Sequence, residues 1–241
     1  MVAFVRRFDA DYQEAYDKIQ SGAIGRPLVV RSMGCERVDN SPGYKQYLKA
    51  SGGIFVDSII HDIDLSLFLL GEDCQPKSVT SAGLAAVHEE LTAEGDADNA
   101  VGICEFWDGK IAFFHNSRTA VRGYDNATEI YGTKGKVSIN VVPRRSRVEL
   151  SDEGGFNKVE PTEGWYDRYS EAFMVEANAW VNAALDDVQM PVPLKSSLKS
   201  LRIALALQES LATGKKIEFD QNGQRRAHVQ EPNGCTCTRV L

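Results

Sequence analysis

The stretch SGGIFVDSIIHDIDLSLFLLG, from Ser51 to Gly71, most constrains the fold because it combines a regular apolar pattern with ionisable side chains. When each residue is turned about 100° from the last, the large apolar side chains fall on one side, which predicts an amphipathic helix against a core. Two glycines before the pattern and Gly71 after it favour a tight entry and a left-handed helix end. The predicted core side consists of Val56, Ile59, Ile60, Ile63, Leu67 and Leu70.

Asp57, His61 and Asp64 lie beside this apolar side at positions i, i+4 and i+7, so each is about one turn from the next. A neutral imidazole that a carboxylate orients is suited to proton transfer near pH 7. The structural alternative is a histidine at the edge of the core that donates a hydrogen bond to Asp57. A third interpretation is a manganese or iron site formed by the three side chains. The spacing alone leaves all three open.

The chain has 241 residues, of which 43% are hydrophobic and 25% charged, as expected for a globular chain with a sizeable core. A net charge of −7 without a basic block argues against nucleic acid or an anionic membrane as a partner. Neither a membrane-spanning run nor a signal-peptide pattern occurs, so the expected location is cytoplasmic. The odd count of five cysteines indicates reduced thiols, and the C-x-C formed by Cys235 and Cys237 stays unexplained.

Helices and strands are predicted from periodicity, caps and turn residues. Asp9 or Asp11 can cap a helix that extends to Ser21, and a third long helix is expected at residues 196–212. The polar segment 220–241 is expected to be disordered. Strands are predicted at 2–5, 28–38, 77–87, 99–106, 110–119, 128–131 and 136–142, with a weaker pair at 147–150 and 157–160. The second long helix is predicted at 166–185, with Phe173, Ala177, Trp180 and Ala184 on its apolar side.

These elements predict an α+β fold with a large, mostly antiparallel open sheet and helices packed on one face. Along residues 99–119 both alternating sets of side chains are apolar, which indicates a sheet buried on both sides. We therefore expect a homo-oligomer in which a second copy covers the open sheet face. The two sets are exemplified by Val101, Ile103 and Trp107 and by Cys104, Phe106 and Ala112.

Four motifs occur in order: VAFVRRFDADY, then SGAIGRP before a strand, then GGIFVDSIIHDIDLSLFLLG, then GYDNATEIYGTKGKV. Together with RYxxAFxxE from Arg168 to Glu176, they resemble the C-terminal part of the glucose-fructose oxidoreductase and inositol dehydrogenase (Gfo/Idh/MocA) family over roughly residues 1–219. Members of that family transfer hydride between NAD(P) and a sugar or cyclitol. The resemblance implies a substrate and oligomerisation domain at 26–219. Before it, residues 1–25 would be the last strand and linking helix of a dinucleotide-binding domain.

The resemblance also implies roles for individual residues. His61 would accept the hydroxyl proton as hydride leaves the same carbon, and Asp57 would orient the imidazole or bind a neighbouring hydroxyl. Tyr124 and Asp64 are candidate substrate contacts, with a turn tyrosine packed on the sheet and a structural ion pair as their alternatives. Arg7 is a candidate cofactor contact, with an exposed salt bridge as its alternative. A loop at residues 44–49 and the helix at Arg168 would line the pocket.

Several departures from the family pattern bear on activity. The chain has no G-x-G-x-x-G turn between a strand and a helix, no Glu-Lys-Pro motif to supply a lysine, and Phe173 where tyrosine is common. We therefore expect the chain alone to bind NAD or NADP poorly, which calorimetry would test, and to turn over little substrate. Two explanations account for these departures. The chain is either a truncated form of a complete dehydrogenase or a non-catalytic substrate-domain paralogue used for binding or assembly.

The dipeptide His61-Asp62 also occurs in metal-dependent phosphohydrolases of the HD type. Those enzymes use further histidines and aspartates on a helical bundle. This chain has only four histidines, at 61, 88, 115 and 228, and a strand-rich middle. The hydrolase is therefore the least supported alternative.

Overall fold

A computed structural model describes residues 1–121, 123–141, 151–152, 155–156 and 162–226. Among these residues, seven strands form one sheet in the order β6-β5-β1-β4-β3-β2-β9. All neighbours are antiparallel except β1 and β4, which run parallel because the helices and β2 and β3 lie between them in the chain. The strands are β1 Pro27–Arg37, β2 Pro76–Leu84, β3 Asn99–Phe106, β4 Ile111–Ala120, β5 Asp125–Gly132, β6 Lys136–Ile139 and β9 Ile217–Glu218.

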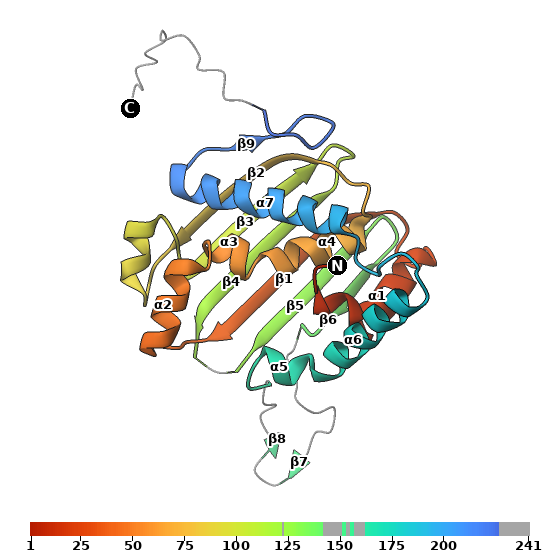
Figure 1. Cartoon of the computed structure of the whole chain (residues 1–241), viewed down its shortest axis with the longest axis horizontal. Coiled ribbons are helices and arrows are strands. Elements are labelled where there is room, and N and C mark those ends of the chain that lie inside the picture. The colour runs from red at the N-terminus through yellow and green to blue at the C-terminus, as the bar shows by residue number, and fades with distance from the viewer. Residues whose placement is uncertain (122, 142–150, 153–154, 157–161, 227–241) are drawn as a thin grey trace.

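Helices cover one face of this sheet, with α3, α4 and α7 crossing it and α1 and α6 at one end (Figure 1). The predicted α+β fold, with a mostly antiparallel open sheet and helices on one face, is therefore confirmed. The helices are η1 Val5–Phe8 and η2 Glu89–Glu94, both 3-10 helices, and α1 Ala10–Gln20, α2 Pro42–Ala50, α3 Ile54–Asp57, α4 Ile60–Leu70, α5 Trp165–Arg168, α6 Ser170–Leu185 and α7 Leu194–Thr213. A small separate hairpin pairs β7 Ser151–Asp152 with β8 Gly155–Phe156.

The helix predicted over residues 51–71 is two helices, which corrects the sequence interpretation. The amide of Ile59 donates to the carbonyl of Ile54, five residues back, at 2.9 Å, so the regular ladder is interrupted between α3 and α4. Gly53 begins α3 at a φ of 94° and Gly71 ends α4 at a φ of 114°, conformations that favour glycine. The break changes the relative direction of Asp57 and His61, which fall on different helices.

Both termini also differ from expectation. Residues 2–5 form no strand: Phe4 and Val5 bury their side chains, and the chain turns directly into η1. At the other end, Phe219 and Arg225 form a β-bridge that closes an ordered turn within the segment predicted to be disordered. Residues 227–241, with Cys235 and Cys237, and the predicted pair at 147–150 and 157–160 lie outside the described residues. As predicted, Cys35, Cys74 and Cys104 are free thiols.

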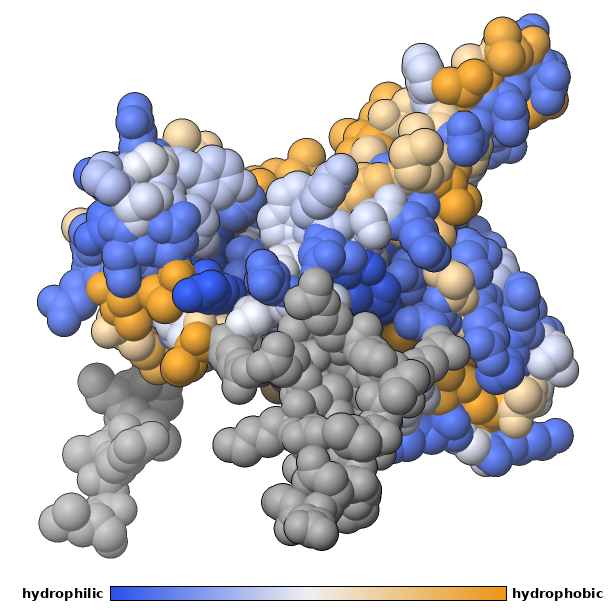
Figure 2. Space-filling view, turned by 90° about the horizontal axis from the view of Figure 1, so that it is seen from below, coloured by the Kyte–Doolittle hydropathy of each residue, from blue (hydrophilic) through white to orange (hydrophobic). Residues whose placement is uncertain are grey.

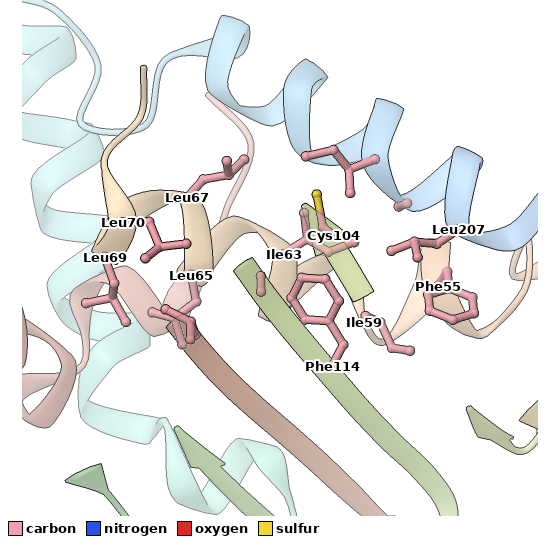
Figure 3. Close-up of a cluster of buried hydrophobic side chains, with 14 of the residues drawn as sticks. Phe55, Ile59, Ile63, Leu65, Leu67, Leu69, Leu70, Cys104, Phe114 and Leu207 are labelled. Carbon is pink, nitrogen blue, oxygen red and sulfur yellow. The ribbon is translucent and has the colours of Figure 1, made fainter. Parts of the chain in front are cut away.

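The core lies between the helical layer and the sheet. Ile59, Ile63, Leu67 and Leu70 are buried as predicted, and they pack with side chains of β3, β4 and α7 (Figure 3). Leu65 and Leu69, outside the predicted core side, are equally buried. Helix α4 is therefore enclosed on nearly all sides because α7 and β1 both pack against it.

Helix α6 buries a different side from the predicted one. It contacts η1 and buries Ala172, Glu176 and Ala183, whereas Trp180 keeps 48% of its surface exposed and Leu185 keeps 78%. The predicted helix is also interrupted at Tyr169, which precedes α6. Figure 2 shows hydrophobic residues gathered on an arm that projects on the side where α1 and α6 lie in Figure 1.

The sheet face away from the helices carries Val101, Ile103 and Ile111, each about two-fifths exposed, while Cys104 and Ala112 on the opposite face are buried. A second copy of the chain as cover for this open face stays a prediction. In the described part of the chain, no helix combines the length and apolar character needed to cross a membrane.

Candidate active site

A cavity of about 510 Å³ opens beside the break between α3 and α4. The structure brings three sequence-predicted residues, Asp57, His61 and Tyr124, together on its wall. Tyr44 and Tyr47, from the segment expected to line a pocket, also contribute, although that segment is helix α2 rather than a loop. The remaining lining residues are Ala3, Val5, Arg6, Glu36, Ser58, Trp165, Tyr169 and Phe173.

His61 occupies the first turn of α4, and the ring of Phe4 packs against its imidazole edge to face, with 5.8 Å between the ring centres. Burial of the imidazole and the nearby positive charge of Arg6 lower the pKa of His61 to about 4. No described residue forms a hydrogen bond with its ring nitrogens. The ring is therefore neutral at pH 7, and a nitrogen is available to accept a proton from a ligand.

Asp57 is held by residues other than His61. Arg118 Nη2 donates to its Oδ2 at 2.6 Å, and the Tyr47 hydroxyl donates to its Oδ1. The same guanidinium reaches Asp96 at 3.3 Å, and Asp96 accepts a hydrogen bond from the Ile54 amide at the start of α3. The structure does not form the hydrogen bond from His61 to Asp57 that the spacing suggested, and the two residues lie on different helices, α4 and α3.

A buried ion pair forms the base of the cavity. Arg6 Nη1 donates to Asp62 Oδ1 at 2.6 Å, and the Ser32 hydroxyl of β1 donates to the same oxygen at 2.6 Å. Arg6 Nη2 donates to the Tyr124 hydroxyl at 3.1 Å, which fixes the phenol at the cavity wall. Asp62 is fully buried, so its charge depends on these partners.

Behind Tyr124, hydroxyl and amide groups continue this polar base. Asn126 Nδ2 donates to the hydroxyls of Tyr169, at 2.5 Å, and Tyr12, at 3.1 Å. The Tyr12 hydroxyl lies 3.1 Å from Thr128 Oγ1. All four residues are buried, so the cavity wall is held by satisfied hydrogen bonds rather than by solvent.

The other two sequence candidates, Asp64 and Arg7, pair with each other outside the cavity lining. Arg7 Nε and Nη2 donate to the two carboxylate oxygens of Asp64 at 2.7 and 2.8 Å, and Arg7 Nη2 also reaches Ser196 Oγ at 2.8 Å. Both side chains are buried, which corrects the exposed salt bridge considered for Arg7. Asp64 thus takes the structural pairing that was its alternative role.

The metal interpretation needs Asp57, His61 and Asp64 at one point, and the structure does not bring them together. Asp64 is directed toward Arg7, and Asp57 toward Arg118. Among the described residues, no group of three histidine, cysteine, aspartate or glutamate side chains is arranged to hold a metal ion.

Sequence reasoning missed four residues that build this site: Arg6, Asp62, Arg118 and Glu36. The arginines look like surface charges in the sequence, and their carboxylate partners are dozens of residues away. Glu36 stands near the end of a predicted strand, next to the first residues of a loop. For Asp62 a signal existed, because a charged residue inside an apolar helix requires a partner.

Replacing Arg118 with methionine tests how strongly the carboxylate network depends on it. Arg118 is 1% exposed and its partners Asp96 and Asp57 are 4% and 18% exposed, so the variant leaves two shielded carboxylates unpaired. We expect Arg118→Met to lower the free energy of unfolding by about 3 kcal/mol in urea denaturation. The control Arg31→Met removes an exposed ion pair to Glu129 and should cost less than about 1 kcal/mol. Equal losses in the two variants would contradict this assignment.

The ionisation of His61 can be followed by NMR. Its imidazole C–H resonances should titrate with a midpoint at about 4, below the ordinary histidine pKa of 6.5. Because the unfolded chain takes up this proton at higher pH, the contribution of His61 to stability is complete above 6.5 and is lost as the pH falls toward 4. His61→Asn assigns the resonance and should reduce this pH dependence. A midpoint near 6.5 would show a solvated ring.

The family model for the GFO/IDH/MocA C-terminal domain matches residues 12–138. The myo-inositol 2-dehydrogenase of Thermotoga maritima is 30% identical over 218 residues, which is 90% of this chain and 64% of that protein. The inositol 2-dehydrogenase of Rhizobium meliloti is 32% identical over 91% of this chain and 64% of its own length. This chain thus spans somewhat under two thirds of these relatives.

Solved structures give the same result. The scyllo-inositol dehydrogenase from Lactobacillus casei, determined with bound NAD(H) and scyllo-inositol, superposes with a TM-score of 0.82 at 28% identity, over 90% of this chain and 64% of that one. A probable dehydrogenase from Thermotoga maritima superposes with a TM-score of 0.81 at 29% identity, over 90% of this chain and 64% of its own. As the sequence motifs predicted, the chain belongs to the GFO/IDH/MocA C-terminal domain family.

Proposed function

We propose that this chain is the polyol-binding part of an inositol-type dehydrogenase, in which His61 accepts the hydroxyl proton during oxidation of a secondary alcohol. The names of the relatives, which are inositol and scyllo-inositol dehydrogenases, support this class of substrate. The observation that carries the proposal is the neutral His61 imidazole, whose ring nitrogens no described residue pairs, on a cavity wall that it shares with Asp57 and Tyr124.

The chemistry requires a base close to the alcohol. When hydride leaves a carbinol carbon, the hydroxyl proton must leave too, and a group within hydrogen-bond reach must take it. His61 is uncharged at pH 7, so a ring nitrogen offers a lone pair to that proton, and its lowered pKa of about 4 makes it a weaker base than an ordinary histidine. The cavity volume of about 510 Å³ is within the range of small-molecule sites and exceeds what a six-membered ring needs.

Asp57 then acts on the substrate rather than on the imidazole. Its carboxylate is fixed by Arg118 and Tyr47, and each oxygen keeps a lone pair for a hydroxyl donor on the polyol. The phenol of Tyr124, held by Arg6, offers a second fixed polar contact. Tyr44, Trp165 and Phe173 supply aromatic surface for the apolar faces of a ring.

NAD is the hydride acceptor that the relatives favour, since the Lactobacillus casei structure is described with NAD(H). The described residues do not fit its phosphates. Gly22–Gly25 join α1 to β1, Gly52 and Gly53 join α2 to α3, and Gly132–Gly135 join β5 to β6, so none lies between a strand and a following helix. We therefore assign polyol binding and proton transfer to the residues of the cavity. We assign no contact with the pyrophosphate to the described part of the chain.

The same cavity also supports a second candidate function, because its lining can bind a polyol whether or not hydride transfer follows. A substrate-domain paralogue that binds a polyol without oxidising it would keep the same cavity and need no phosphate site. The two candidates share the ligand class and differ in turnover.

Myo-inositol and scyllo-inositol, titrated into the labelled protein, should shift resonances of the cavity residues. In an assay that couples polyol oxidation to NAD⁺ reduction, His61→Asn should lower kcat by about 10²–10⁴-fold because the proton acceptor is lost. The control His115→Asn alters a histidine on the open sheet face and should leave the rate unchanged.

Turnover by the wild-type protein would contradict the binding-only candidate, whereas binding without turnover agrees with either candidate, because the described residues do not fit the phosphates of NAD. Absence of polyol binding would contradict both candidates, and equal rates for wild type and His61→Asn would remove His61 as the proton acceptor.

A further inference from the structure

Besides its tyrosines, the cavity is lined by four ionisable side chains, Arg6, Glu36, Asp57 and His61. Arg6 is engaged by Asp62 and Tyr124, and Asp57 by Arg118 and Tyr47. Glu36 differs, because no described residue donates a hydrogen bond to its carboxylate or forms an ion pair with it. Together with the His61 ring, Glu36 is therefore a polar group of the cavity whose hydrogen-bonding capacity is left for a ligand.

Glu36 reaches the cavity near the end of β1. Alternate residues of β1 point to the helical layer, as Ser32 and Gly34 do, and Glu36 lines the cavity where the pairing of β1 with β4 shifts register between Cys35 and Arg37. Ser32 donates to Asp62, and a Cβ on Gly34 would lie 3.4 Å from Arg6 Nη2. This face of β1 thus passes directly beneath the Arg6 guanidinium. Glu36 lies two residues beyond Gly34, roughly 7 Å further along β1, where the strand reaches the cavity wall.

The charges around Glu36 favour a ligand that donates hydrogen bonds to its carboxylate. Burial and the nearby negative charge of Asp57 raise the pKa of Glu36, while Arg118 and Arg6 oppose that shift without contacting the carboxylate. Two carboxylates on one wall leave several lone pairs unpaired. A ligand with several neighbouring O–H donors satisfies both, whereas an anionic ligand would add repulsion.

We propose that Glu36 is a substrate-binding residue that selects a vicinal diol, its two carboxylate oxygens accepting hydrogen bonds from two neighbouring hydroxyls of the polyol. The assignment rests on the proposed polyol site and adds a determinant of specificity to it. The diol lies on ring carbons other than the carbinol that faces His61. A ring that lacks one of these hydroxyls leaves a shielded carboxylate oxygen unpaired, so it binds less tightly.

The test measures dissociation constants by NMR titration of the whole chain with inositol and with a set of inositols that each lack one hydroxyl. Glu36→Gln should weaken inositol binding about tenfold or more, since charge-assisted hydrogen bonds become neutral ones. Glu36→Gln should also discriminate less than the wild type against the analogue that lacks a paired hydroxyl. A merely structural role would change all affinities by the same factor.

Glu129→Gln is the matched control, because Glu129 lies outside this cavity, where it pairs with the exposed side chains of Arg31 and Lys136. It should bind every ligand as the wild type does. Glu36→Gln should unfold at no lower temperature than the wild type, since it removes a charge that Asp57 repels.

Unchanged affinity in Glu36→Gln, or an equal loss for every analogue, would overturn this assignment while leaving the polyol site intact. Failure of the wild-type chain to bind any inositol would overturn both.

Discussion

The site depends on the hydrogen bonds and the ion pair that the fully buried carboxylate of Asp62 forms. Asp62 lies in the first turn of α4 and accepts hydrogen bonds from Arg6, in the N-terminal segment, and from Ser32, in β1. A buried charge without its partner costs several kcal/mol, so these three elements are held together. Arg6 in turn holds Tyr124, which brings the start of β5 to the same cavity.

Arg118 joins further elements in the same way. It extends from β4 to Asp57 at the end of α3 and to Asp96, whose other oxygen holds the start of α3. The two arginines therefore fix both sides of the helix break. Asp57 pairs with Arg118, and the charges of Asp62 and Asp57 raise the pKa of His61 by less than burial and Arg6 lower it, so the imidazole stays neutral at pH 7. On the cavity wall, Asp57 is thus placed to position hydroxyls and His61 to accept a proton.

Local patterns predicted much of the fold. Asp9 caps α1 through the Tyr12 amide, as the sequence predicted. Gly214 ends α7 at a φ of 66° and Gly109 turns the β3–β4 hairpin at a φ of 82°, conformations that favour glycine. Spacing and family resemblance together found Asp57, His61 and Tyr124. These features depend on residues close in sequence, or on motifs that specify the local fold.

What the sequence did not predict depends on distant contacts. Periodicity continues unbroken through Ser58, yet tertiary packing interrupts the helix there and separates Asp57 from His61. The partners Arg6 and Asp62 are 56 residues apart, and Arg118 and Asp57 are 61 apart, so no local pattern connects them. Helix α6 shows the same limit: its contact with η1, not its own apolar side, decides which residues are buried.

The central claim is that a polyol hydroxyl meets a neutral His61 in this cavity. A crystal structure of the protein soaked with scyllo-inositol tests it most directly. The account predicts a ring hydroxyl within about 3 Å of a His61 ring nitrogen and another on the Asp57 carboxylate. A ring bound elsewhere on the molecule, or a His61 imidazole with no hydroxyl beside it, would contradict the account.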